Sequence, residues 1–457
     1  MTRRNKLLLA LAVAALVFLG GWAGGTLAAP GRTASAAPEP ASSSGTGQEA
    51  PAGADCGKGT TALSHRFPAG SSWRMCWSID PQQGLTLTQV SYTAPGKDAL
   101  PVVQEISLSQ LEVPYDTGVR TTRDITEHGF GGRNMKTLGS AECAGSRLAA
   151  SLPDFGTGTV GGSETREVVC TEEVDAGLGR RSEYTGSPVA QRGRSFEIST
   201  LSVVGWYEYL SLYSFGEDGS ITPRLGATGD LSPEDYSHDE QHGSPVGPGT
   251  TEAATSHSHN AVWRIHWGLP GPQSVQEYNA DFTGSRGKDA AIVNGTFTAL
   301  GTESQRLRAD RRWWRVLGSG KNPDGHQISY RIQLDQSDGY TPHSHGDHAG
   351  QDGPGAGDAA FGYDVAFTQF KDCERYATQN LSTGCPTSGI PQFLSGEKLS
   401  DVVSWVAVSY HHVPRDEDQS PMDVHWQGFS LQPRDAFSQN PLTPPERSPV
   451  NGKPSAG

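Results

Sequence analysis

The feature that most constrains this fold is a two-residue alternation of apolar and polar side chains in short runs. It is clearest over residues 85–92, which read Leu-Thr-Leu-Thr-Gln-Val-Ser-Tyr. Successive side chains of a strand point to opposite faces of a sheet, so the pattern predicts half-buried antiparallel strands. The same texture recurs in five later segments: 196–215, 261–267, 313–316, 328–334 and 402–410.

The composition agrees with a large all-β protein. The 457 residues include 57 Gly and 30 Pro, which favour strands and turns, and the 35% hydrophobic content suffices for a large core. No linker-like stretch separates the strand-like runs before a His-rich insert at 341–357. We therefore expect one large antiparallel β-sandwich domain over residues 56–445, followed by a disordered tail at 446–457.

The amino terminus has the pattern of an export segment. Arg3, Arg4 and Lys6 precede an apolar run that ends near residue 27, and Ala-rich sites follow. Residues 1–29 are predicted to be a signal peptide or an uncleaved membrane anchor, because the run is nearly long enough to span a bilayer. Residues 30–55, rich in Ala, Pro and Ser, are predicted to be a linker. The protein is thus expected to be exported, either secreted or held at the cell surface.

The net charge of −14 argues against nucleic acid as a partner, because nucleic acids recruit basic surfaces. It fits a solvated acidic exterior and mildly favours cationic substrates such as amines.

Six cysteines in an exported chain are typical of three disulfides. Proximity in sequence suggests three pairs, although six cysteines allow fifteen pairings. The suggested pairs are Cys56 with Cys76, Cys143 with Cys170, and Cys373 with Cys385. A zinc site is the less favoured alternative, since no Cys-x-x-Cys pair exists.

A metal site is suggested by His257-Ser258-His259 together with His411-His412. On a strand, residues i and i+2 share a face, so the first two imidazoles would project side by side. One more imidazole completes a three-nitrogen site suited to copper, zinc, iron or nickel. The competing interpretation is an ordinary surface pair. The histidines of the insert, His343, His345 and His348, are more typical of a surface loop that binds metal adventitiously.

Several separated stretches, in the right order, resemble the catalytic domain of copper amine oxidases. Val113-Pro114-Tyr115 resembles the family's Val-Pro-Tyr-Gly-Asp motif, and Trp206-Tyr207-Glu208-Tyr209 stands where the family has Asn-Tyr-Asp/Glu-Tyr. His257-Ser258-His259 falls on the family's copper pair, and His412-Val413-Pro414-Arg415 resembles the segment with the third copper histidine. The resemblance covers most of residues 70–442.

The resemblance implies copper bound by three histidines and a topaquinone cofactor made from Tyr207. It implies oxidation of a primary amine by dioxygen to an aldehyde, ammonia and hydrogen peroxide. Tyr115 and Asp116 would join Tyr207 in the catalytic group, the carboxylate removing the α-proton. The implied copper ligands are His257, His259 and His412. The resemblance also implies a homodimer linked by hairpin arms, for which residues 305–330 are a candidate.

The chain departs from the family pattern beside these catalytic positions. The family's Tyr-Gly-Asp is replaced by Tyr115-Asp116-Thr117, so the carboxylate comes one residue early and, on a strand, would face the other way. Trp206 replaces the family's Asn, and Tyr207 lies in an aromatic run that core packing alone would explain. Three hypotheses follow: a divergent primary-amine oxidase, a non-catalytic extracellular relative that binds copper or another ligand, or a copper site with different oxidation chemistry at Tyr207 or another aromatic residue.

Overall fold

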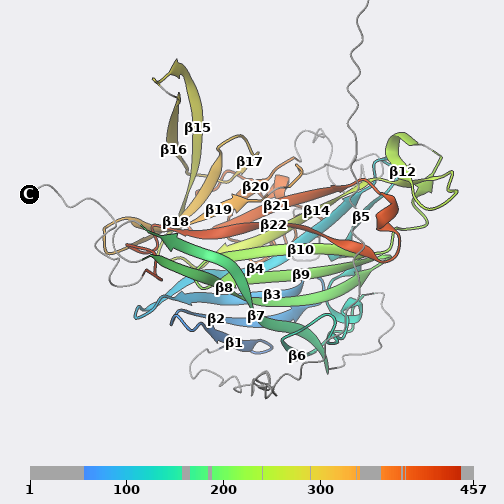
Figure 1. Cartoon of the computed structure of the whole chain (residues 1–457), viewed down its shortest axis with the longest axis horizontal. Helices are drawn as coiled ribbons and strands as arrows, with labels where there is room; N and C mark the ends of the chain where they lie inside the picture. Colours follow the sequence, from blue (N-terminus) through green and yellow to red (C-terminus); the bar gives the residue numbers. More distant parts are fainter. Residues whose placement is uncertain are drawn as a thin grey trace, which may run out of the picture. The chain divides into compact units, whose positions relative to one another are not determined.

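The alternating runs form two large antiparallel sheets (Figure 1). The computed structural model describes residues 56–156, 165–183, 188–238, 240–288, 290–335, 337–339, 362–381, 384–385 and 388–443, all within one compact unit. Among these residues the sheets have nine and ten strands, and a small third sheet has three. The predicted all-β, antiparallel fold class is confirmed.

The strands of the nine-stranded sheet, in spatial order, are β1 (Thr61–Arg66), β2 (Ser72–Asp80), β3 (Gly84–Thr93), β4 (Ala99–Pro114), β14 (His257–Trp267), β21 (Val402–His412), β20 (Val365–Gln369) and β17 (Ser304–Arg306), with β5 (Thr121–Arg123) beside β4. Those of the ten-stranded sheet are β16 (Ala291–Leu300), β15 (Ser274–Arg286), β18 (Trp313–Lys321), β19 (Gln327–Leu334), β22 (Met422–Arg434), β10 (Ile221–Gly229), β9 (Tyr207–Gly216), β8 (Val189–Val204), β7 (Thr165–Ser182) and β6 (Ser146–Ser151).

The remaining elements are short. The third sheet is formed by β11 (Tyr236–Ser237), β13 (Ala253–Thr255) and β12 (Gly243–Pro245). The helical turns are η1 (Asp124–His128), η2 (Gly132–Asn134), η3 (Glu240–His242), α1 (Ile390–Phe393) and η6 (Asp416–Asp418). Among the residues that the structure describes, no helix combines the length and apolar character needed to cross a membrane.

The main core lies between the two large sheets. Aromatic rings from opposite sheets meet there, since the Trp73 and Phe215 centroids are 5.1 Å apart and those of Trp263 and Phe429 are 5.4 Å apart. Burying one large apolar side chain contributes about 1.5–3 kcal/mol, so this layer supplies much of the driving force for folding.

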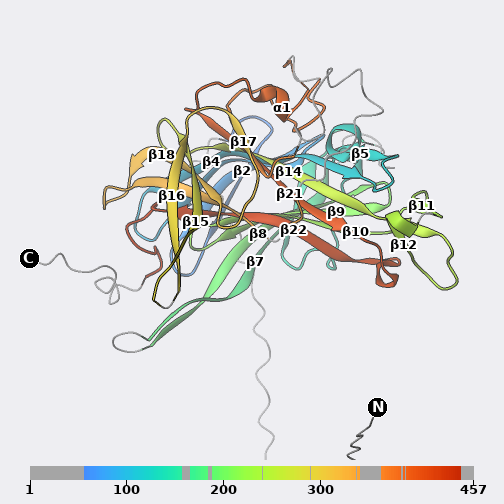
Figure 2. The ribbon, with the colours of Figure 1, turned by 90° about the horizontal axis from the view of Figure 1, so that it is seen from above.

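Strand β14 is buried along its whole length because both of its faces are covered. Trp263 and Ile265 belong to the core between the sheets, whereas Val262, which precedes Trp263, packs on the opposite face with Trp405 and α1. Figure 2 shows α1 and its flanking segment beside β14 and β21. The central strands therefore have no face exposed to solvent, and their register is strongly specified.

Three disulfides join the described cysteines. They are Cys56–Cys76, Cys143–Cys170 and Cys373–Cys385, which confirms the pairs suggested by proximity. The predicted leader (1–29), linker (30–55), tail (446–457) and insert histidines (His343, His345, His348) lie outside the described residues.

The expected hairpin arm at residues 305–330 is not a separate arm. That range forms β17, β18 and the start of β19, which pair within the two sheets. A hairpin that does extend from the sheets is β15–β16 (Figure 1), and hairpin β7–β8 extends in another direction (Figure 2). Large apolar side chains that are 41–57% exposed lie on β15–β16: Phe282, Ile292, Val293 and Phe297.

The buried carboxyl group of Glu374 is expected to make the stability of the fold depend on pH. Burial raises the pKa of its carboxyl from 4.5 to about 7, although Lys371 opposes the shift. The folded state therefore holds this proton more tightly than the unfolded state. The resulting stabilisation is complete below pH 4.5 and is lost as the pH rises through 7. In Glu374→Gln, we expect the fall in unfolding free energy between pH 4.5 and pH 8 to shrink by up to about 3 kcal/mol.

Urea denaturation at several pH values measures this effect. The exposed acid Asp98, changed to Asn, is the matched control and should leave the pH dependence of the wild type intact. Equal pH profiles for wild type and Glu374→Gln would contradict the assignment.

Candidate metal centre

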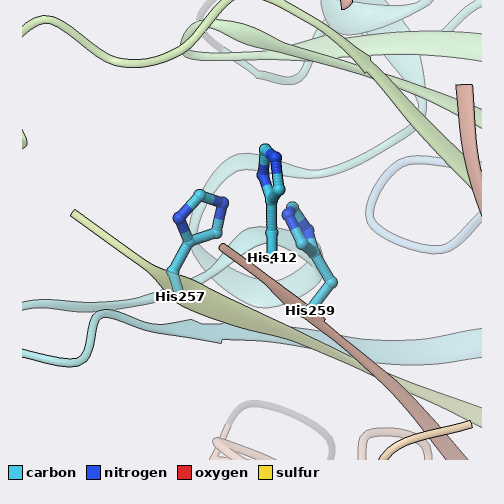
Figure 3. A group of neighbouring side chains, drawn as sticks. All are labelled: His257, His259 and His412. Atoms are coloured by element: carbon cyan, nitrogen blue, oxygen red, sulfur yellow. The ribbon is translucent and has the colours of Figure 1, made fainter. Parts of the chain in front are cut away.

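Three buried imidazoles meet at one end of the two central strands. His257 is the first residue of β14 and pairs in register with His412, the last residue of β21, while His259 lies two residues further along β14. The ring centroid of His257 lies 5.0 Å from that of His259 and 5.1 Å from that of His412. Each ring offers one nitrogen, and these nitrogens lie within 4.8 Å of one another. Figure 3 shows the three rings on the same side of the strands.

Strand alternation explains why these three histidines converge. His257 and His259 continue the row of β14 that faces the core between the sheets, as Ala261 and Trp263 do. His412 is even-numbered like the core-facing Val406 and Val408, whereas His411 points to the outer face and is exposed. Because alternate residues share a face, the same alternation selects His412 rather than its neighbour.

The tautomer of His257 is fixed by its neighbours. Its Nδ1 lies 3.1 Å from the carbonyl oxygen of Thr255, which can only accept, so Nδ1 carries the proton. Burial, with a further contribution from His412, lowers the pKa of His257 to about 3, and the ring is neutral at pH 7. Its Nε2 is therefore an open electron-pair donor, and it lies 2.8 Å from the hydroxyl of Tyr207.

His412 is oriented in the same way, with its two nitrogens exchanged. Its Nε2 lies 3.0 Å from Oδ2 of Asp418, which also accepts from the backbone N–H of Arg415. Both side chains are 1% exposed. The Nδ1 of His412 is thus the open donor, and it lies 3.2 Å from the same Tyr207 hydroxyl. A histidine that binds a metal commonly donates its other ring N–H to a carboxylate in this way, which fixes the tautomer and the orientation of the ring.

The cluster has more lone pairs than protons. The Tyr207 hydroxyl has one hydrogen but faces the unprotonated nitrogens of two histidines. In His259, burial lowers the pKa well below its usual range, and the buried Nδ1 has no hydrogen-bond partner within the part of the chain that the structure describes. A cation would satisfy donors that a single proton cannot. The residues present therefore fit a metal ion that prefers imidazole nitrogen.

Tyr207 reaches this centre from the other sheet. It is the first residue of β9, directly after the tight turn from β8, where Gly205 has a φ of 60°. Trp206 occupies the same turn and is 46% exposed, whereas Tyr207 is 5% exposed. Burial, followed by the nearby Tyr115, Asp418 and Asp235, raises the pKa of the Tyr207 phenol. The indole that replaces the family's Asn thus faces solvent rather than the histidines.

Tyr115 and Asp116 follow the end of β4, next to His257. Tyr115 forms a bridge with His257, and their ring centroids are 4.8 Å apart. The Asp116 carboxylate lies on the outer face, where its Oδ2 is 2.9 Å from Nε2 of the exposed His411. The structure therefore brings Tyr115 to the centre and engages Asp116 in a hydrogen bond with His411 at the surface.

Sequence reasoning gave no role to several residues around this centre. Asp418 stands in a stretch that resembles the family, but nothing in the sequence indicates that it binds His412. His425 is a further neighbour, because its Nε2 lies 3.5 Å from Oδ1 of Asp418. Arg120 and Asp235 form an ion pair beside Tyr115, and their separation of more than one hundred residues leaves no sequence signal.

Known proteins resemble this chain over most of its length. The sequence model of the copper amine oxidase enzyme domain matches residues 70–449. The chain is 26% identical to primary amine oxidase 2 of Arabidopsis thaliana over 395 residues, covering 81% of this chain and 57% of the relative. It is also 26% identical to histamine oxidase of Arthrobacter globiformis over 406 residues, covering 81% of this chain and 56% of the relative.

The fold is also similar to that of solved amine oxidases. The copper-containing benzylamine oxidase of Hansenula polymorpha aligns with a TM-score of 0.67 at 20% identity, over 84% of this chain and 63% of that chain. The Aspergillus nidulans amine oxidase aligns with a TM-score of 0.68 at 18% identity, over 81% of this chain and 52% of that chain. Because the family model matches most of its residues, the chain belongs to the copper amine oxidase family.

Proposed function

We propose that this protein binds one copper ion through His257, His259 and His412 and oxidises a primary amine through a quinone derived from Tyr207. The products would be an aldehyde, ammonia and hydrogen peroxide. The observation that carries the proposal is the Tyr207 hydroxyl, which faces open nitrogens of two histidines in a buried three-histidine cluster. The relatives are named as amine oxidases, but the chain spans little more than half of their length.

Copper suits this donor set better than magnesium or calcium, which prefer oxygen ligands. The Thr255 carbonyl and the Asp418 carboxylate hold two of the rings in the tautomers that a metal requires. Copper would activate dioxygen for the oxidation of the adjacent Tyr207. Once formed, the quinone would supply an electrophilic carbonyl for a primary amine and would accept two electrons.

The remaining groups would orient the substrate and move a proton. Tyr115 packs against His257 and would bound the space next to the Tyr207 ring. Removal of the proton from the carbon beside the amine nitrogen needs a general base, which sequence reasoning assigned to Asp116. That role stays a prediction, and the hydrogen bond of Asp116 with His411 gives no support to it.

The same hydrogen bond favours one alternative function. If no carboxylate reaches the ring of Tyr207, the protein would be a copper-binding relative without amine oxidase activity. In this alternative the three histidines would still bind copper, but no amine would be oxidised.

We also propose that the protein is exported and forms a homodimer. Three disulfides are typical of proteins that fold in an oxidising compartment. The exposed apolar side chains of hairpin β15–β16 are better covered by a second copy than left in water.

The metal ligands are tested by comparing two adjacent histidines. We expect wild-type protein to bind one copper ion per chain and His412→Asn to lose tight binding, because one of three ligands is removed. His411→Asn is the matched control, since His411 lies on the outer face and should be dispensable. Asp418→Asn should weaken copper binding about 10–100-fold through loss of its support to His412.

Metal analysis after dialysis and competition with a chelator measure these affinities. Equal loss of copper in His411→Asn and His412→Asn would contradict the ligand assignment.

The cofactor is tested on protein expressed without copper and then exposed to copper and air. We expect the peptide with Tyr207 to gain two oxygen atoms and lose two hydrogens, and to react with phenylhydrazine. Peptide mass spectrometry detects both changes. Tyr207→Phe should abolish them, whereas Tyr209→Phe, two residues along the same strand face, should retain them.

An unmodified Tyr207 in a chain that holds one copper ion would overturn the oxidase proposal. It would leave the copper-binding alternative.

The dimer is tested on hairpin β15–β16. The double variant Phe282→Ser with Val293→Ser should shift the mass in solution from dimer to monomer, because it removes two exposed apolar side chains. Light scattering coupled to size-exclusion chromatography gives the mass. The control Leu178→Ser, an equally exposed residue on hairpin β7–β8, should remain dimeric, and a dimeric double variant would exclude this hairpin as the contact.

A further inference from the structure

A group of arginines lies on the outer face of the ten-stranded sheet. Residues 305–315 read Gln-Arg-Leu-Arg-Ala-Asp-Arg-Arg-Trp-Trp-Arg, which places five arginines in a short segment of a chain whose net charge is −14. The last of them, Arg315 of β18, pairs in register with Arg331 of β19, and Arg434 ends the next strand, β22 (Figure 1). Trp314, next to Arg315, belongs to the core between the sheets, so strand alternation turns Arg315 and its cross-strand partner outward.

The candidate metal centre lies at the opposite end of this sheet. Tyr207 pairs with Gly229 of β10, and Gly229 pairs with Met422 at the start of β22. Arg434 is the last residue of that strand. Because a strand rises about 3.3 Å per residue, the length of β22 separates Arg434 from the row of Tyr207 by up to roughly 40 Å. A role of these arginines would therefore be separate from the proposed oxidation.

Three aromatic rings form a floor beneath the arginines. Phe297 of β16 pairs with Tyr278 of β15, and Tyr278 pairs with Trp313 of β18, so one row of rings crosses three strands. The Tyr278 ring centroid lies 5.1 Å from that of Phe297 and 5.0 Å from that of Trp313. Gly295 leaves room for this floor, because a Cβ at that position would lie 2.0 Å from the Tyr278 hydroxyl oxygen. The register of the sheet thus builds the floor.

Each of the three guanidiniums lies over a ring of this floor. The guanidinium carbon of Arg315 is 4.4 Å from the Phe297 centroid, and that of Arg331 is 4.6 Å from the Trp313 centroid. Arg434 lies over both rings, at 4.8 Å from Trp313 and 5.6 Å from Phe297. A guanidinium stacked on a ring keeps its N–H donors in its own plane, where they remain available to a ligand.

The positive charge of this group is only partly balanced. Asp435 accepts a 3.1 Å contact from Arg315 and lies 4.0 Å from Nε of Arg434. Arg331 forms no hydrogen bond or ion pair within the described ranges, and the buried Nε atoms of Arg331 and Arg434 have no partner there. Three positive charges against one negative charge leave a net charge of +2 on the group.

The arginines also repel one another. Burial lowers the pKa of Arg315 and that of Arg331, and the nearby charge of Arg434 lowers both further. A bound anion would offset this repulsion, since the guanidiniums are held close together by rings that cannot neutralise them.

A cavity of about 220 Å³ opens beside Arg315. Its walls are formed by Arg315, Leu317, His326, Gln327 and Asp435. Four of these five side chains are polar, and Asp435 is the one acid among them. The cavity therefore offers space for a small polar group next to the guanidiniums.

We propose that Arg315, Arg331 and Arg434, stacked on their aromatic floor, bind a tetrahedral oxyanion, phosphate or sulfate, either as the free ion or as an ester carried on a polymer. We call this site the arginine platform. The planar fork of a guanidinium matches two oxygens of such an anion, and forks from adjacent strands can hold one group from several sides. A charge of about −2 on the anion balances the +2 of the group.

The test uses titration calorimetry of the full-length protein with sodium phosphate, sodium sulfate and dextran sulfate. We expect one site per chain that weakens as sodium chloride is added, because its contacts are ionic. Arg331→Gln and Arg434→Gln should each weaken binding about tenfold or more, because charge-assisted hydrogen bonds are lost. Asp435→Asn should strengthen binding, because the carboxylate that competes with the ligand is removed.

The control removes the same charge elsewhere. Arg192 is 67% exposed on hairpin β7–β8 and pairs with Asp175, so Arg192→Gln should bind each anion as the wild type does. Urea denaturation checks that each variant is folded. Stronger binding by Asp435→Asn is a further safeguard, because a damaged fold would not produce it.

The results identify the source of the anion or overturn the inference. Binding of the free ions alone supports a small-molecule site, and binding of dextran sulfate alone supports an ester on a polymer. No binding by the wild type, or equal binding by the wild type, Arg331→Gln and Arg434→Gln, overturns the inference. A wild-type dimer that Arg331→Gln converts to a monomer, with anion binding unchanged, would assign the arginine platform to contact with a second copy instead.

Discussion

The pairing of β14 with β21 is the constraint on which the candidate metal centre depends. It sets His257 opposite His412 and places His259 two residues away on the same face. A slip of one residue would bring His411 into the pair and turn every side chain of the strand over. Because both faces of β14 are buried, such a slip would move the side chains of each buried layer into the other, where they do not fit. The packing of these two layers thus fixes the positions of the three histidines.

The second sheet completes the centre by bringing Tyr207 against these histidines. The Tyr207 hydroxyl contacts one ring nitrogen of His257 and one of His412. The other nitrogen of each ring is held by a hydrogen bond, to the Thr255 carbonyl in His257 and to the Asp418 carboxylate in His412. The two rings present different nitrogens, Nε2 and Nδ1, to the same oxygen. In a buried site of low dielectric, these hydrogen bonds are strong, so each ring stays in one tautomer and one orientation. The groups behind the two rings therefore hold them in the tautomers that a metal would require.

Alternation in the sequence sufficed to predict the fold class and the shared face of His257 and His259. Proximity predicted the three disulfides, because each pair lies within one local stretch of strands. The hydrogen bond between Asp418 and His412 and the ion pair between Asp235 and Arg120 could not be predicted this way. Both come from loops whose paths depend on the packing of complete sheets, and a hydrogen bond between distant residues has no periodic signal. The extended hairpin was misplaced because exposed and buried strands share the same alternation.

The departures from the family pattern fall next to the residues of the site rather than on them. Trp206 precedes Tyr207, and Asp116 follows Tyr115, so each changed side chain points away from the ring beside it. A strand can accept such changes without moving the ligands. Asp116 differs from Trp206 in one respect, because the general-base role predicted for it would require a side chain on the inner face. Its carboxylate binds His411 on the outer face instead, so the strand that keeps the three histidines in place also holds this acid away from Tyr207.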